Sequence, residues 1–319
     1  MDCIILAGNK ESYRRVTALD NKAFLPIDDQ NILNLMLIQI AEVPEVERVL
    51  IVGPAKRLEE EIAPLRQSGY PKPLLIFEQK NDLVANAVSV VDATSEGQPE
   101  DRYVLILPSD IPVLVSEELR EFIALCDMDR YDYITGLVTE EVMQAYYPQG
   151  DKPGVQMAYL YAGKHGYRPN NLHMVRPSKL GRLQYVRQTY SVRYQKKWIN
   201  ILIAAKTLLG MIRHLPGSVF IYLFFQAARL SHAYGLTRLG HWIQNRLKLE
   251  TAERYGSRIL DTRFKLVITH FGGAAVDVDN ESDYFAIRAR WREWIQLQKE
   301  VDSPRRVTTE TGTVSGIPS

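Results

Sequence analysis

The chain has 319 residues, of which 46% are hydrophobic and 24% are charged, as is typical of a folded protein with a sizeable core. It holds two cysteines, and it has neither a CxxC motif nor the Cys/His spacing of a zinc site, so zinc-binding modules are excluded. The net charge of +1 conceals an asymmetry, because residues 174–265 hold 17 Lys or Arg and only 3 Asp or Glu.

The first 140 residues alternate between apolar runs and segments with helical periodicity. Alternation at this spacing predicts right-handed crossovers and a mainly parallel sheet with helices on both faces, which is an α/β fold. We expect strands at 2–7, 48–53, 74–78, 103–107 and 132–138, and helices at 31–42, 55–67, 82–93 and 116–126. Cys3 lies in the first apolar run and is expected to be a reduced, buried thiol.

Beyond residue 140 the pattern loosens. The stretch VQMAYLYAG at 155–163 predicts a strand, residues 264–269 predict another, and residues 282–297 predict a helix that Asn280 or Ser282 can cap. The tail at 301–319 is polar and without apolar periodicity, which predicts disorder. No signal peptide is recognised, so a cytoplasmic location is expected.

Four polar stretches follow predicted strands or short apolar runs: LAGNKESYRR, NKAFLPI, PSDIPVL and DVDNESDY. Ligands of parallel α/β sheets bind beyond the carboxyl ends of the strands, so these stretches are expected to meet there. Gly8 would allow a phosphate to approach the backbone closely, although no GxxxxGK[ST] motif is present. Lys22 with Arg14 or Arg15 would neutralise a polyphosphate.

Acidic residues of the same stretches predict a divalent metal site. Asp110 and Asp279 provide hard oxygen ligands for Mg²⁺ or Mn²⁺, which bind one or two carboxylates together with substrate phosphates. Since Asn280 or Ser282 can cap the following helix, Asp277 and Asp279 are not needed for capping. Asp277 is therefore a third candidate metal ligand.

Taken together and in this order, IILAG, NKAFLPI, PSDIPVL and DVDNESDY resemble the motifs of the molybdenum-cofactor-nucleotidyltransferase-like group of NTP transferases. The resemblance covers roughly residues 1–175 and 264–295. It implies a Rossmann-like, glycosyltransferase-A-like fold with a mainly parallel mixed sheet. It also implies an enzyme that transfers a nucleotide from a nucleoside triphosphate to a phosphate-bearing or hydroxyl acceptor in a Mg²⁺-dependent reaction, with release of pyrophosphate.

The resemblance assigns roles to single residues. Lys22 would contact the triphosphate, and Asp110 and Asp279 would bind the metal. Asn171, with Lys152 nearby, would hold the acceptor. The residues that the resemblance implies for nucleotide binding are Leu6, Ala7, Gly8, Asn9, Arg14, Arg15, Asn86 and Ser109.

The first loop departs from the family pattern, which usually reads LAGG followed by a small residue and an arginine. Here Asn9 replaces the second glycine, and Asn tolerates a left-handed backbone better than most residues. The departure favours an alternative, a non-catalytic nucleotide-binding or membrane-docking relative. A second alternative is a glycosyltransferase that uses a nucleotide-sugar, because DVD at 277–279 matches a DxD motif.

We predict three parts: a core of residues 1–175 and 264–300, a basic helical insert at 176–263, and the tail. Within the insert, Pro216 and Gly217 separate two expected amphipathic helices at 195–214 and 217–233. Three interpretations of these helices stay open. They pack on the core or on a second copy in a homodimer, they contact anionic lipid at the inner membrane face, or, least favoured because no motif accompanies the charge, they bind nucleic acid. The insert would also shape the acceptor site, for instance for a lipid-headgroup precursor.

Overall fold

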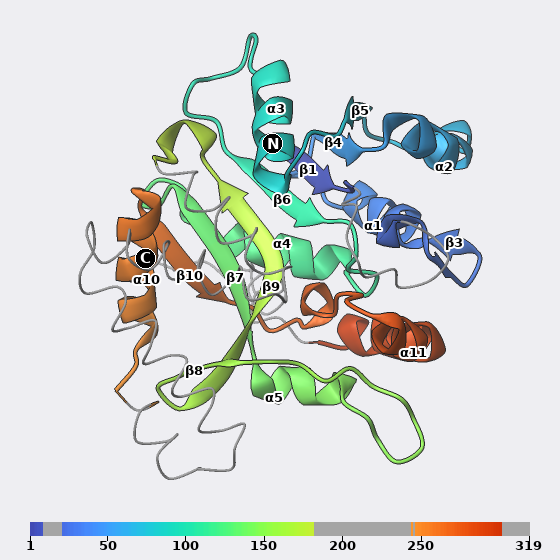
Figure 1. Ribbon diagram of the computed structural model, residues 1–319, viewed down its shortest axis with the longest axis vertical. Coiled ribbons are helices and arrows are strands. Elements are labelled where there is room, and N and C mark those ends of the chain that lie inside the picture. Colours follow the sequence, from blue (N-terminus) through green and yellow to red (C-terminus); the bar gives the residue numbers. More distant parts are fainter. Residues whose placement is uncertain (9–20, 182–243, 245, 302–319) are drawn as a thin grey trace, which may run out of the picture.

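The computed structural model describes residues 1–8, 21–181, 244 and 246–301, which build an eight-stranded, mostly parallel sheet between helices (Figure 1). The expected α/β, Rossmann-like fold is confirmed. The strands run in the order β10-β7-β9-β6-β1-β4-β5, and β8 pairs with β9. Their bounds are β1 Asp2–Leu6, β4 Arg48–Gly53, β5 Leu74–Glu78, β6 Val104–Pro108, β7 Tyr133–Thr139, β8 Leu160–Ala162, β9 His165–Val175 and β10 Phe264–Ile268. A separate hairpin pairs β2 Pro26–Ile27 with β3 Gln30–Asn31.

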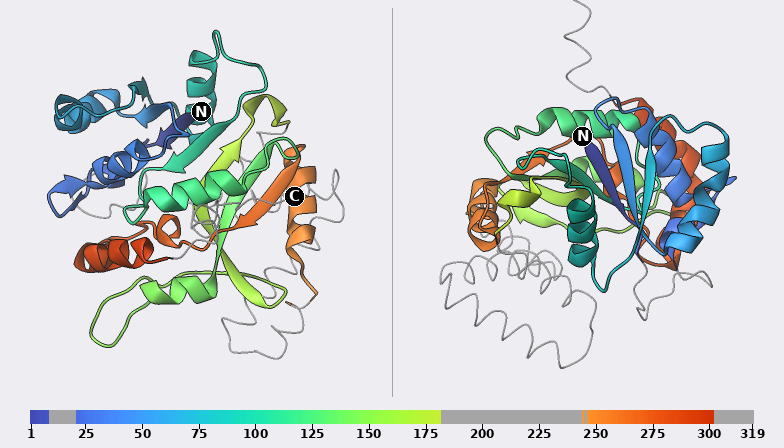
Figure 2. Two further views of the ribbon diagram at one scale, coloured as in Figure 1. Left: turned by 180° about the vertical axis from the view of Figure 1, so that it is seen from behind. Right: turned by 90° about the horizontal axis from the view of Figure 1, so that it is seen from above.

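Helices cover both faces of the sheet (Figure 2). One face carries α1 Ile32–Ala41, α2 Ala55–Gln67, α4 Ser116–Leu125 and α11 Glu281–Lys299, and the other carries α3 Leu83–Ala93 and α10 Leu249–Leu260. A short helix, α5 Glu140–Met143, follows β7. Single 3₁₀ turns are η1 Lys22–Phe24, η2 Gln144–Tyr146, η3 Pro177–Lys179 and η4 Gly273–Ala275.

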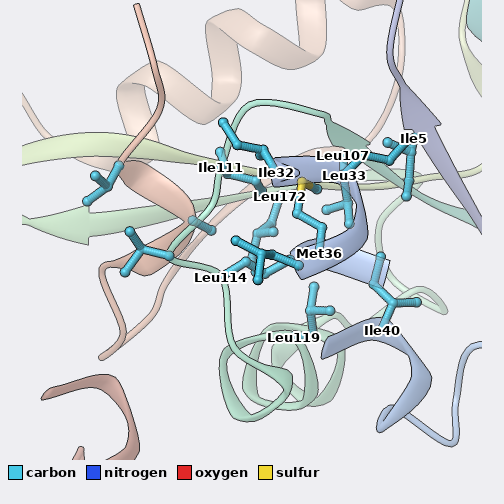
Figure 3. Close-up of a cluster of buried hydrophobic side chains, with 14 of the residues drawn as sticks. Ile5, Ile32, Leu33, Met36, Ile40, Leu107, Ile111, Leu114, Leu119 and Leu172 are labelled. Atoms are coloured by element: carbon cyan, nitrogen blue, oxygen red, sulfur yellow. The ribbon is translucent and has the colours of Figure 1, made fainter. Parts of the chain in front are cut away.

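The two faces are separated by the alternation of side chains along each strand. On β1, Cys3 and Ile5 point to the face of α1, and Ile4 packs with Val90 of α3 on the other face. The larger cluster gathers α1, α4 and the centre of the sheet around Met36 (Figure 3). Cys3 is completely buried, as expected, and burial raises the pKa of its thiol.

The sequence pattern did not predict strand β9, which lies in the middle of the sheet. It lies antiparallel between the parallel strands β6 and β7. The pairing with β7 shifts register between Thr135 and Leu137, opposite a stretch that contains Pro169, and Asn171 has a positive φ of 61°. Proline and a left-handed residue interrupt the regular alternation by which a strand is recognised, so RPNNLHMV did not indicate one.

Most other expected bounds agree with the structure within two residues, but the expected strand at 155–163 is limited to β8. Helix α10 lies inside the predicted insert, where no helix at these residues was predicted. The predicted helices at 195–214 and 217–233 and the predicted disordered tail from 302 on lie outside the described residues. Among the residues that are described, no helix is long and apolar enough to cross a membrane.

Candidate active site

Four charged side chains meet at the carboxyl ends of β1 and β6; we call Lys22, Asp110, Asp277 and Asp279 the Lys–Asp cluster. Lys22 Nζ lies 3.1 Å from Asp110 Oδ2 and 3.5 Å from Asp279 Oδ1. Asp110 follows β6, and Asp279 follows η4, 169 positions later in the chain. The fold therefore brings together the three residues that the sequence analysis assigned to catalysis.

Lys22 is held in place by its neighbour Asn21. The Asn21 side chain accepts a hydrogen bond from the Ala23 amide at 2.9 Å, which caps η1. Its Nδ2 donates to the Ala7 carbonyl oxygen at 2.7 Å. Because Asn21 is buried, these two bonds tie the start of η1 to the end of β1 and so fix the backbone that carries Lys22.

Asp110 is fixed through its backbone. The Val278 amide donates to the Asp110 carbonyl oxygen at 3.0 Å, so the loop after η4 joins the end of β6. Trp291 of α11 donates from Nε1 to the carbonyl of Pro112 at 2.8 Å and holds the segment that leaves the strand. The Asp110 carboxylate, whose side chain is 20% exposed, then faces the Lys22 ammonium.

Arg168 on β9 supports the third carboxylate and was not singled out from the sequence. Its Nη2 donates to Asp277 Oδ1, and its Nε donates to the Ala275 carbonyl at 2.9 Å. Asn171, three residues along the same strand, donates to the Ala274 carbonyl at 2.9 Å. Arg168 and Asn171 of β9 thus anchor η4 and the loop that carries Asp277 and Asp279.

The cluster is electrostatically crowded. Burial disfavours the charged form of Lys22, but the carboxylates of Asp110 and Asp279 outweigh burial and raise the pKa of the ammonium. Burial, followed by the negative charges of Asp110 and Asp279, raises the pKa of Asp277 to about 6, against the opposing effect of Arg168. Three carboxylates share two cations, so the cluster favours an additional positive charge.

The carboxylates of the cluster fit a divalent ion whose coordination is completed by phosphate oxygens of the substrate. Asp110 and Asp279 both lie within reach of one ammonium group, and Mg²⁺ uses one or two carboxylates together with phosphate oxygens and water. Within the described ranges, no group of three or more His, Cys, Asp or Glu side chains is arranged to hold a metal ion. Asp277 is engaged by Arg168, which leaves Asp110 and Asp279 as the pair suited to this role.

Gly8, at the end of β1, is exposed, and two side chains lie close to its Cα atom. A Cβ atom on Gly8 would lie 2.9 Å from Asn86 Nδ2 and 3.3 Å from Gln79 Oε1, so glycine leaves the room that these side chains occupy. The Asn86 Oδ1 atom accepts from the Lys80 amide, which places Asn86 at this end of the sheet. Asp82 caps α3 through a hydrogen bond from the Ala85 amide at 2.8 Å.

The remaining predicted residues divide into three groups. Ser109 is buried directly before Asp110. Lys152 is not brought to the cluster, because its Nζ pairs with Glu293 of α11 at 3.0 Å. Asn9, Arg14 and Arg15 lie outside the described residues.

A cavity of about 810 Å³ opens at the Lys–Asp cluster. It is lined there by Lys22, Asp110, Asp277, Asp279 and Asn171, and it continues between α3 and the sheet. Asn171 therefore borders both the cluster and the cavity, as its predicted contact with an acceptor requires.

A family comparison shows the family of the chain. Residues 3–227 match the family model of the MobA-like NTP transferase domain, which is well over half of the chain. The chain belongs to the MobA-like NTP transferase domain family. The resemblance seen in the sequence motifs is thereby confirmed, and nucleotidyl transfer is the activity class of the family. The match also runs through residues 176–227, which the sequence analysis placed in the insert.

Solved structures show what this MobA-like NTP transferase is similar to. A hypothetical transferase from Thermus thermophilus aligns with a TM-score of 0.55 at 20% identity, covering 88% of this chain and 98% of that one, and it shows the fold. A CMP:2-keto-3-deoxy-manno-octonic acid synthetase complexed with CTP aligns at 0.40 and 12% identity, covering 68% and 86%. A 4-diphosphocytidyl-2C-methyl-D-erythritol synthase from Anaerococcus prevotii aligns at 0.44 and 9% identity, covering 92% and 97%. No curated protein matches this chain.

Proposed function

We propose that the chain is a Mg²⁺-dependent nucleotidyltransferase that moves a nucleoside monophosphate from a nucleoside triphosphate to a phosphate or hydroxyl oxygen of an acceptor. The observation that carries the proposal is the position of the Lys22 ammonium between Asp110 and Asp279 at the carboxyl ends of the strands. Family membership supports the activity class, and the geometry supports the residue roles.

The reaction is a displacement at the α-phosphorus. An acceptor oxygen forms a bond to that phosphorus, the bond to the bridging oxygen of the β-phosphate breaks, and pyrophosphate leaves with the electron pair. Such a step depends on positioning and charge stabilisation rather than on a covalent intermediate. A phosphate acceptor is already ionised near neutral pH, so it needs no general base, whereas a hydroxyl acceptor would release its proton to solvent water as its oxygen bonds to phosphorus.

The side chains of the Lys–Asp cluster would have different roles in this reaction. Lys22 would stabilise the charge that develops on the departing pyrophosphate, and its raised pKa keeps it protonated at neutral pH. Asp110 and Asp279 would hold the divalent ion, which when bound supplies a Lewis acid and a template for phosphate oxygens. Arg168 positions Asp277 and the loop behind them. The open end of β1 at Gly8 is suited to contact the nucleotide phosphates.

The first test is thermal unfolding of the wild type with ATP, CTP, GTP and UTP in turn, with and without Mg²⁺. A ligand at about a hundred times its Kd stabilises the folded state by about 2.7 kcal/mol, which is a readily measured shift of the midpoint. We expect a Mg²⁺-dependent shift with at least one nucleotide. Asp110→Ala should abolish it, whereas Asp29→Ala, which removes an exposed carboxylate in the β2–β3 turn, should keep it.

The outcomes separate the alternatives. A shift with nucleotide-sugars but with none of the four triphosphates would favour the glycosyltransferase. No shift with either class would favour a non-catalytic relative. A Mg²⁺-dependent shift that survives in Asp110→Ala would remove Asp110 from the metal site and overturn the residue assignment.

A further inference from the structure

The cavity beside the Lys–Asp cluster extends far beyond the space that a metal and phosphates need. From Asp110 it follows β6 and β9 down the sheet to Val175, which pairs with Val104 at the opposite end of β6. Leu180 and Leu260 of the α10 side complete that end. Since β6 has five residues at about 3.3 Å each, the cavity runs along roughly the full length of this strand.

One side of α3 gives the cavity an apolar wall. The helix residues that line it recur at helical spacing and form one stripe: Leu83, Val84, Ala87, Val88 and Val91. Ile106 of β6 and Val175 of β9 line the sheet side. In Figure 1 this region lies between α3 and α10, over β6 and β9. The volume of about 810 Å³ falls in the range of sites that enclose organic ligands.

Charged lining residues lie at the two ends of the cavity and not along its middle. One end holds the Lys–Asp cluster, and the far end holds Asp92, Glu100 and Arg102. Arg102 is engaged there, since it donates to the carbonyl oxygens of Thr94 and Val91 at 2.6 Å each. In the middle, His173 shares a hydrogen bond of 3.1 Å with the Tyr133 hydroxyl, and burial lowers the pKa of His173 to about 4, so the imidazole is neutral.

Helix α3 also carries Asn86, which lies beside the backbone at Gly8 and accepts a hydrogen bond from the Lys80 amide. The cavity reaches the end of β1, because Leu6 is part of its lining. A nucleotide bound at Gly8 and the contents of the cavity would thus be neighbours that meet at the Lys–Asp cluster. A long apolar space in this position suits the second substrate.

We propose that the acceptor is an amphiphile whose phosphate or hydroxyl head reaches the Lys–Asp cluster and whose aliphatic chain occupies the cavity. This inference rests on the proposed nucleotidyl transfer, and it names the class of acceptor. A chain that leaves water for an apolar wall gains affinity with every methylene group, by a factor of about four. Affinity should therefore rise with chain length in a way that a site for small polar acceptors would not show.

The test is isothermal titration of the full chain with butyl, octyl and dodecyl phosphate, each below its critical micelle concentration and without Mg²⁺. Octyl phosphate should bind on the order of a hundredfold more tightly than butyl phosphate. Farnesyl phosphate, compared with dodecyl phosphate, distinguishes an isoprenoid from a straight chain. The triphosphate titration of the wild type with Mg²⁺ is measured separately and decides the proposed function.

A matched pair of substitutions on α3 tests whether the aliphatic chain of the ligand binds in the cavity. Ala87→Trp fills the middle of the apolar stripe and should reduce the preference for octyl over butyl phosphate at least tenfold. Ala93→Trp adds the same side chain at an exposed position of the same helix, outside the cavity lining, and should retain the preference. Val88→Trp is the second blocking variant if Ala87→Trp does not fold, as judged by its circular dichroism.

Equal affinity for butyl and octyl phosphate would overturn the inference even when Mg²⁺-nucleotide binding succeeds. A preference for octyl over butyl phosphate that survives in both blocking variants would overturn it as well, since the aliphatic chain would then bind elsewhere. A length preference with no nucleotide binding would leave a lipid site without transfer, which would overturn the acceptor role together with the proposed function.

Discussion

Arg168 and Asp277 form an ion pair that joins strand β9 to the loop carrying two carboxylates of the Lys–Asp cluster. Both side chains are 17% exposed, and Arg168 Nε also donates to the Ala275 carbonyl at 2.9 Å. An ion pair with so little solvent exposure is costly to break on one side only, because the remaining charge keeps its desolvation penalty. The pair therefore couples the stability of the fold to the geometry of the site.

Arg168→Ala should lower the free energy of unfolding by about 2–4 kcal/mol, because it leaves Asp277 without its cation. It should also raise the pKa of Asp277 above its present value of about 6, since Arg168 is the group that opposes burial there. Urea unfolding at neutral pH measures the first effect. In a double-mutant cycle with Asp277→Ala, the two losses should be less than additive by more than about 1 kcal/mol. Additive losses would show that the pair is not coupled.

Asp110→Asn keeps the size of the side chain and removes its charge. If the proposed function holds, turnover should fall on the order of a hundredfold or more, comparable to the loss of one major transition-state contact. Initial rates of pyrophosphate release measure it, with the acceptor and nucleotide found by binding. Activity near that of the wild type would exclude Asp110 as a metal ligand.

Asn21→Ala should damage the site through the backbone. The substitution leaves the Ala7 carbonyl and the Ala23 amide without their partner, which should cost about 1–3 kcal/mol of stability. Asn21→Asp keeps the acceptor for the Ala23 amide but places a buried carboxylate oxygen against the Ala7 carbonyl oxygen, so it should be destabilising as well. If Lys22 acts as proposed, both variants should also weaken Mg²⁺-nucleotide binding. Unchanged stability in Asn21→Ala would contradict the tie between β1 and η1.

Glu118→Gln should change how stability depends on pH. Glu118 is completely buried, and burial raises the pKa of its carboxyl from the ordinary 4.5 to about 8, although the Ala274 amide donates to Oε2 at 2.9 Å. Between these two pH values the folded chain keeps a proton that the unfolded chain has released. The stability from this group is therefore full below pH 4.5 and declines as pH rises toward 8, by about 1.4 kcal/mol per unit.

The glutamine variant has no proton to lose, so it should match the wild type near pH 5 and exceed it by a few kcal/mol near pH 8. Urea unfolding of both proteins at several pH values measures the difference. The neighbouring Glu121–His270 pair is present in both proteins and cancels in the comparison. Parallel pH curves for the two proteins would refute the assignment.

The sequence pattern predicted the sheet and the principal charges of the site, because both depend on local signals. Apolar runs bounded by polar loops identified β1, β4 and β6, and a carboxylate placed directly after a strand identified Asp110. Of the two capping residues that the sequence offered, Asn280 and Ser282, Asn280 is the one that caps α11, since its side chain accepts from the Asp283 amide at 3.0 Å. The meeting of Lys22 with Asp110 and Asp279 follows from the rule that strand ends share one edge.

Long-range pairing determined what the sequence did not reveal. Arg168 becomes part of the site only because β9 inserts antiparallel between β6 and β7, and its irregular alternation concealed the strand. The sequence around Asn21 gives no sign of its hydrogen bond to the Ala7 carbonyl oxygen, which forms only in the folded chain. The cavity likewise depends on how α3 and α10 are spaced over the sheet, which no local pattern encodes.

Because Asp277 and Asp279 come after β10, the Lys–Asp cluster is incomplete until the chain beyond residue 264 has been synthesised. A nascent chain that ends before residue 264 lacks β10, so it exposes the edge of β7. It also lacks α11, so Tyr146 is without its ring contact with Trp294. It also holds Lys22 and Asp110 without their partner carboxylates. The charged site therefore forms no earlier than β10 joins the sheet.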